Sequence, residues 1–204
     1  NHRVKNNLLA IIGMVHKEQD RSEERDQFET VTVLENIGAR ISALFTVHSL
    51  LSANRWRPVQ LSDLCERVVG ASLAGISAST KSSLEVTPSP ITVESDQANH
   101  LAMVLNELTT NSIKHSTDRE AGATLRIDIS IATQRDVVKL IFHDNGPGIP
   151  QKLLDGDFSE AGVGFDLLRG IIRKSLRGEL SMSNRKGARF EIRFPIEPTL
   201  GGDQ

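Results

Sequence analysis

The chain has a single cysteine, Cys65, among its 204 residues. An internal disulfide and a cysteine-based metal cluster are therefore excluded, and the composition fits a reducing compartment. The chain also lacks any apolar run near the ~18 to 20 residues that span a bilayer, and no signal-like segment opens it. We therefore expect a cytoplasmic location, which leaves open a membrane anchor elsewhere in a longer protein.

An excess of charge of one sign is also missing, because the formal net charge is −2 and acidic and basic residues are interspersed. Nucleic acid or an anionic membrane is therefore not expected as the main partner, and a charged ligand must be bound by a local site. With 38% hydrophobic residues the chain can bury a core in one large or two small domains. Because it begins with Asn1 instead of Met, we expect a fragment whose upstream part, such as a sensor domain, is missing.

Two early segments repeat apolar residues at steps of three and four, which predicts two helices packed as an antiparallel hairpin. The first series is Val4, Leu8, Ile11 and Val15, and the second is Leu34, Ile37, Ile41, Leu44, His48 and Leu51. His2 lies about 200° around the first helix from Val4 and should face outward. Such a hairpin needs a further apolar surface, so we expect a homodimer through a four-helix bundle, with packing on a missing domain as the alternative.

Pro58 interrupts the helical pattern, and we place a domain boundary there. The expected units are a helical hairpin at residues 1–57, a second domain at residues 58–198 and a tail at residues 199–204. In the second domain, periodicity predicts helices over residues 61–73, 95–115 and 163–176 and strands over 84–87, 91–94, 125–131, 137–143, 179–183 and 189–194. The fold class is therefore α+β, a helical hairpin followed by an α/β sandwich in which helices cover one face of a mixed sheet.

The predicted helix 95–115 carries a polar face with Glu107, Asn111 and Lys114. The amide oxygen of Asn111 suits Mg²⁺, Glu107 can orient a nucleophile or take its proton, and Lys114 can contact phosphate. His115 can line a nucleotide pocket, although a position at a helix C-terminus explains it equally well. The alternative for the whole face is the solvated side of an amphipathic helix.

Two glycine turns follow. Asp144 ends an apolar strand and opens the first turn, D-N-G-P-G-I-P, where its carboxylate can accept a hydrogen from an adenine amino group. The second turn, G-V-G, opens the next helix, where free N–H groups favour phosphate. Their glycines are Gly146, Gly148, Gly162 and Gly164. The polar segment 151–161 between them is expected to be a short mobile lid. Taken alone, the first turn is equally well an ordinary strand-to-loop turn.

Three motifs in this order resemble the catalytic core of sensor histidine kinases: H-R-V-K-N-N-L at residues 2–8, N-E-L-T-T-N-S-I-K-H at 106–115, and the glycine boxes at 144–148 and 162–164. The first motif is similar to that of the H-R-x-K-N-N-L subclass, close to the HWE kinases. The other motifs resemble the Bergerat-type ATP-binding domain that these kinases share with gyrase and heat-shock ATPases.

The resemblance implies that the γ-phosphate of ATP moves to His2 and then to an aspartate of a response-regulator receiver domain. It also implies that Asn111 holds Mg²⁺, that Asp144 fixes adenine and that the four glycines cradle phosphate. Arg3 stands where commoner histidine kinases have an acid, so Glu107 is the candidate proton acceptor. The alternatives are a histidine phosphotransfer protein with a degenerate nucleotide domain, and a protein-serine kinase or ATPase of the same nucleotide fold.

Further positions depart from the expected pattern. Phe165 stands where a smaller aliphatic residue is usual, and Ala188 stands where threonine commonly follows glycine. His48 lies in an apolar series, which favours a core or interface histidine over a catalytic one.

Overall fold

The computed structural model describes residues 38, 41, 43–76, 81–116, 124–158 and 163–196. His2, Gly162, the first predicted helix and the tail 199–204 lie outside these ranges, so the predictions made for them stay predictions. Within the described ranges, no helix is both long and apolar enough to cross a membrane.

A five-stranded mixed sheet forms the centre of the molecule, with the order β2-β4-β5-β7-β6. Its strands are β2 (Ser82–Val86), β4 (Leu125–Gln134), β5 (Val137–Asp144), β6 (Glu179–Asn184) and β7 (Ala188–Pro195). β2 pairs with β4 in parallel and all other neighbours are antiparallel. Two short strands, β1 (Val59–Gln60) and β3 (Thr92–Val93), form a separate antiparallel pair. The predicted mixed sheet is confirmed.

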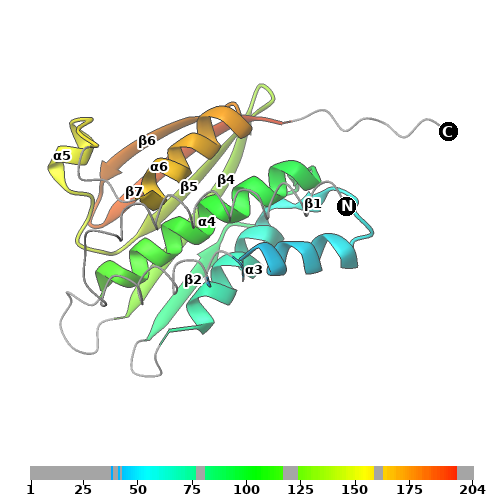
Figure 1. Cartoon of the computed structure of the whole chain (residues 1–204), viewed down its shortest axis with the longest axis horizontal. Helices are drawn as coiled ribbons and strands as arrows, with labels where there is room; N and C mark the ends of the chain where they lie inside the picture. Colours follow the sequence, from blue (N-terminus) through cyan, green and yellow to red (C-terminus); the bar gives the residue numbers. More distant parts are fainter. Residues whose placement is uncertain are drawn as a thin grey trace, which may run out of the picture.

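Three helices lie over one face of the sheet: α3 (Leu61–Ala74), α4 (Ser95–Ser116) and α6 (Val163–Gly170). α4 lies between the other two (Figure 1). It carries an acid, Asp96, in its first turn and bases, Lys114 and His115, in its last turn, an arrangement that complements the helix dipole. The predicted α+β domain, with helices on one face, is therefore present.

The helix predicted over residues 163–176 changes its winding part-way. α6 ends at Gly170 and a π-helical turn, η1 (Ile171–Ser175), continues the chain, with the Leu176 N–H bonded to the Ile171 carbonyl at 3.0 Å. The wider turn brings residues five positions apart toward the same side. Ile171, Ile172 and Leu176 are all buried as a result.

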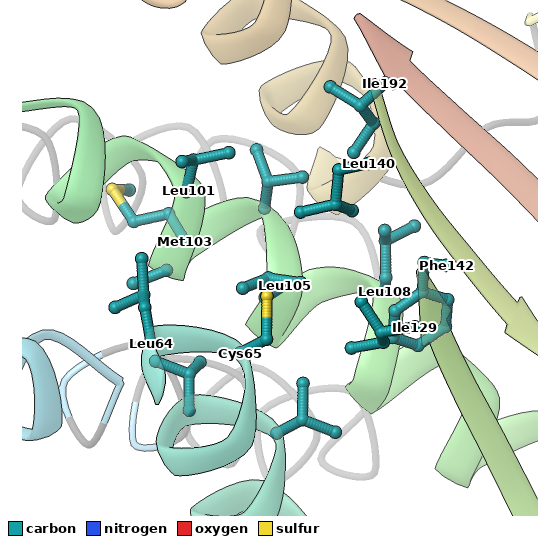
Figure 2. Close-up of a cluster of buried hydrophobic side chains, with 14 of the residues drawn as sticks. Leu64, Cys65, Leu101, Met103, Leu105, Leu108, Ile129, Leu140, Phe142 and Ile192 are labelled. Atoms are coloured by element: carbon teal, nitrogen blue, oxygen red, sulfur yellow. The ribbon is translucent and has the colours of Figure 1, made fainter. Parts of the chain in front are cut away.

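Alternate residues of the central strands face the helices and build the core. Figure 2 shows side chains from α3, α4 and the strands pointing into one cluster. Its labelled members are Leu64, Cys65, Leu101, Met103, Leu105, Leu108, Ile129, Leu140, Phe142 and Ile192. Burial, with a smaller contribution from the charge of Glu66, raises the pKa of the Cys65 thiol far above its ordinary value. The cysteine is a neutral packing residue.

Part of the second predicted hairpin helix is described as helical, over residues 43–53. One face joins the core cluster through Ala43, Leu44, Val47, Leu50 and Leu51. His48 is exposed, with its ring edge-on to Trp56 at 5.2 Å between centroids, so it is not a core residue of this chain. The expectation of a core histidine is therefore wrong, because the buried face of this helix is rotated away from position 48, whereas the expectation of an interface histidine stays a prediction. The boundary at Pro58 stays a prediction.

Candidate nucleotide-binding site

The polar face of α4 runs from the interior to the surface. Glu107 is buried, with 7% of its surface exposed, Asn111 is half-buried, and Lys114 and His115 are exposed. A merely solvated helix face would leave Glu107 in water. A buried carboxylate needs hydrogen-bond or charge partners, so the burial of Glu107 favours a polar site in this part of α4.

Asp144, at the end of β5, has a carboxylate that accepts three hydrogen bonds. Its Oδ2 accepts a hydrogen bond from the Ser112 hydroxyl at 2.6 Å, and its Oδ1 accepts from the Gly146 N–H at 2.7 Å and the Ala188 N–H at 3.1 Å. Only 5% of the residue is exposed. Because an ionised carboxylate has about four acceptor positions, one more donor can be accommodated, as the amino group of adenine requires.

The turn between β6 and β7 closes around Asp144. Gly187 has φ +140°, and a Cβ there would overlap the Asp144 carbonyl oxygen, so only glycine permits this approach. The close approach brings the next N–H, that of Ala188, onto the carboxylate. The threonine expected at position 188 is thus replaced by a residue that contributes through its backbone.

Asn145 takes a structural part in the first glycine turn. Its Oδ1 accepts from the Arg126 N–H at 2.8 Å and its Nδ2 donates to the Thr124 carbonyl at 3.1 Å, which ties the end of β5 to β4. Gly146 and Gly148 follow it, and Gly148 has φ +94°. Of the two predicted cradle residues in this turn, Gly146 lies against the Asp144 carboxylate and Gly148 lies against the Asn184 side chain.

The second glycine turn is described only from position 163. Gly164 lies in the first turn of α6 and is half-buried. The next residue, Phe165, stacks on Phe158 at 5.6 Å between centroids, and the Arg169 guanidinium lies 3.7 Å from the centroid of the Phe158 ring. The unexpected aromatic thus ties α6 to the predicted lid, whose first residues form the one-turn helix α5 (Gln151–Leu154).

A cation at this site would depend on few protein ligands. The described part of the chain contains no group of three or more His, Cys, Asp or Glu side chains that could hold a metal ion. Asn111 offers an amide oxygen, and phosphate oxygens and water would supply the remaining ligands, as Mg²⁺ prefers. The residues present therefore fit a magnesium–nucleotide complex.

The sequence interpretation missed Ser112, Asn184 and Gly187. Ser112 follows Asn111 in its motif, yet its partner Asp144 lies 32 residues away. Asn184 binds Ile149 from 35 residues away, and Gly187 is placed only by the turn geometry. Sequence spacing within one element carries no signal for such contacts.

Residues 96–198 match the family described as histidine kinase-, DNA gyrase B-, and HSP90-like ATPase. The chain belongs to this family. Residues 1–85 also match the HWE histidine kinase family, so the two matches lie one after the other and together cover residues 1–85 and 96–198. The predicted HWE-type histidine kinase core is thereby confirmed, and membership of the ATPase family implies that the domain binds ATP.

Individual histidine kinases are similar at modest identity. The sensor histidine kinase PdtaS of Mycobacterium tuberculosis is 28% identical over 201 residues, which cover 96% of this chain and 38% of that protein. The chain thus spans well under half the length of this relative.

Solved structures share the fold. A blue-light activated histidine kinase of Erythrobacter litoralis superposes with a TM-score of 0.60 at 16% identity, over 90% of this chain and 62% of that one. The ATP-binding domain of PrrB from Mycobacterium tuberculosis gives a TM-score of 0.51 at 27% identity, over 69% of this chain and 97% of that one.

Proposed function

We propose that this histidine kinase core moves the γ-phosphate of ATP to His2 and then to an aspartate of a response-regulator receiver domain. The observation that carries the proposal is the buried Asp144 carboxylate, held by three hydrogen bonds at the end of β5. It supports a specific nucleotide site, to which the motif around His2 adds the phosphate acceptor.

ATP would be bound along α4 and the glycine turns. Asp144 would accept the adenine amino hydrogen, and Asn111 would hold Mg²⁺, which neutralises phosphate charge when bound. Lys114 and His115 would contact the nucleotide. The phosphate cradle would consist of Gly146, Gly148, Gly162 and Gly164.

In the proposed transfer, an imidazole nitrogen of His2 forms a bond to the γ-phosphorus as the bond between that phosphorus and the bridging oxygen of ADP breaks. The attacking nitrogen must be unprotonated, which an ordinary imidazole is at neutral pH. The proton on the other nitrogen becomes acidic and passes to Glu107. Arg3, in place of an acid, would steady the moving phosphoryl group, which a carboxylate oxygen of the receiver then takes from nitrogen.

A homodimer is the proposed assembly. On the helix around residue 45, Ile41 is 49% and Phe45 is 72% exposed, one turn apart on the same face. A second copy could cover this apolar face. Sedimentation at several concentrations tests the proposal, and a Phe45→Glu variant should shift the chain toward monomer, whereas a wild type that stays monomeric at all concentrations would exclude the dimer.

The transfer is tested with γ-labelled ATP and Mg²⁺. Wild type should acquire acid-labile, base-stable label, and His2→Gln and Asn111→Ala should not. His16→Gln, which removes another histidine of the same predicted helix, is the matched control and should label normally. Label that survives His2→Gln would exclude His2 as the acceptor, and phosphate accepted from a phosphorylated receiver without ATP binding would favour a phosphotransfer protein with a degenerate nucleotide domain.

A further inference from the structure

We infer that Asn184, at the end of β6, is a positioning residue that sets the conformation of the first glycine turn for nucleotide binding. The inference rests on the proposed function of this turn as part of the nucleotide site. Asn184 belongs to none of the motifs by which the site was predicted.

The Asn184 side chain forms hydrogen bonds with both backbone groups of Ile149, in the loop after β5. The Ile149 N–H donates to Asn184 Oδ1 at 2.7 Å, and Asn184 Nδ2 donates to the Ile149 carbonyl at 2.9 Å. A primary amide is the side chain that can supply an acceptor and a donor side by side. The amide of Asn184 therefore replaces the pairing that a neighbouring strand would give Ile149.

The same side chain packs on Gly148. That glycine has φ +94°, and a Cβ built on it would lie 2.9 Å from Asn184 Oδ1. The left-handed conformation at Gly148 and the position of Asn184 are thus matched, because any larger residue at 148 would push the amide away. Asn184 therefore favours the loop conformation in which Gly148 has this positive φ.

The β6–β7 turn connects this grip to the adenine-binding carboxylate. Four residues after Asn184, at the start of β7, the Ala188 N–H donates to Asp144, and within the turn the Arg185 carbonyl lies 2.9 Å from His143 Nε2. One short turn therefore fixes the glycine loop, Asp144 and the end of β5 relative to one another. A loop ordered before the ligand arrives lowers the ordering cost of binding.

The test is the affinity for a non-hydrolysable ATP analogue with Mg²⁺, measured by calorimetry at a temperature where every variant is folded. Asn184→Ala should weaken binding by about 10- to 30-fold, since two hydrogen bonds that order the loop are lost. Asn184→Asp keeps the shape of the side chain but places an oxygen against the Ile149 carbonyl, so it should also weaken binding. This variant tests the inference if Asn184→Ala does not fold. Ser181→Ala, an exposed change on the same strand, is the matched control and should bind as wild type does.

Amide hydrogen exchange at Ile149 separates positioning from general stability. In ligand-free Asn184→Ala, exchange at Ile149 should accelerate while buried amides of β5 keep wild-type protection. Affinities of both Asn184 variants within about twofold of wild type, or unchanged exchange at Ile149, would overturn the inference. A wild type that binds the analogue yet never labels His2 would defeat only the proposed function, whereas a wild type that binds no analogue would defeat both.

Discussion

The two faces of the central sheet are stabilised in different ways, although they share every strand. On β5, Leu140 and Phe142 point into the core beneath the helices and are fully buried, whereas their neighbours Lys139, Ile141 and His143 point to the open face. The covered face depends on apolar burial and ends in the proposed nucleotide site. The open face depends on charge pairs, and the comparison shows that period-two alternation alone distributes these two roles.

Three of the ion pairs on the open face share the carboxylate of Glu191, on β7. It is buried, and Arg189 Nη2, Arg193 Nη2 and Lys139 Nζ lie 2.9, 2.6 and 3.3 Å from its carboxylate oxygens. Burial alone would raise the pKa of Glu191, but the hydrogen bonds from these cations outweigh it and lower the pKa to about 2. A charged carboxylate is thereby kept on a face that none of the helices in the described part of the chain covers (Figure 1).

A hollow of about 400 Å³ lies on the same face. Charged and titratable residues line much of it: Glu85, Arg126, Asp128, His143, Arg185 and Arg189. Arg126 pairs with Asp128 at 3.1 Å and with Glu85 at 3.5 Å. These exposed pairs contribute little to stability, in contrast to the apolar contacts of the other face.

The largest contrast should appear in the reactivity of Cys65, which is wholly buried beneath the covered face. A maleimide should label it at least ~1,000-fold more slowly in the native protein than in denaturant, because labelling requires opening of the core. Mass spectrometry over time measures the ratio. Rapid native labelling would show that the helix layer opens easily.

Two adjacent residues of β5 give the next largest effect. Phe142→Ala should lower the free energy of unfolding by ~3 to 5 kcal/mol, because it leaves a cavity in the core. Ile141→Ala, on the open face, should cost only about 1 to 2 kcal/mol because its side chain is already half-exposed. Denaturant titration of both variants measures the difference, and equal costs would contradict the assignment of the two faces.

Glu191→Gln should lower the free energy of unfolding by about 1 to 2 kcal/mol at neutral pH, since three cations lose their anionic partner. The folded-state pKa is depressed below the ordinary 4.5, so this contribution is present above about pH 4.5 and is lost as the pH falls toward 2. Unfolding curves across this range should therefore converge for wild type and variant. A gap that stays constant down to pH 2 would exclude titration of Glu191 as the cause.

The smallest effect is expected for Arg126→Ala, because both of its ion pairs are exposed. The unfolding midpoint should stay unchanged at physiological salt, where exposed charges are screened. A clear loss of stability would mean that the hollow holds a tighter charge network than its exposed pairs indicate.

Much of the domain could be predicted from local pattern. The alternation of apolar and polar residues at Leu125, Ile127, Ile129 and Ile131 predicted strand β4 and its buried face. The polar residues of the site motifs stand where such periodic patterns end, which placed the motifs at the ends of strands and helices. The π-helical turn after Gly170 and the exposure of His48 escaped prediction because helix winding and the direction of the buried face depend on what the helix packs against.

At the site, the residues of the expected chemistry could be predicted from the sequence, whereas the residues that hold them in place could not. Glu107, Asn111, Asp144 and the glycines carry recognisable side chains or turns, so their types and order predicted a nucleotide site. Ser112 and Asn184 are ordinary polar residues whose partners lie on other elements.

The sequence by itself determined the class of chemistry, because residue types and spacing within one helix or turn follow from local geometry. Tertiary structure alone decided how that chemistry is held: which oxygen of Asp144 meets Ser112 or Ala188, and which strand end grips Ile149. Such contacts join residues more than thirty positions apart. Their distances are set by the packing of α4, the twist of the sheet and the β6–β7 turn together, none of which is written in a single motif.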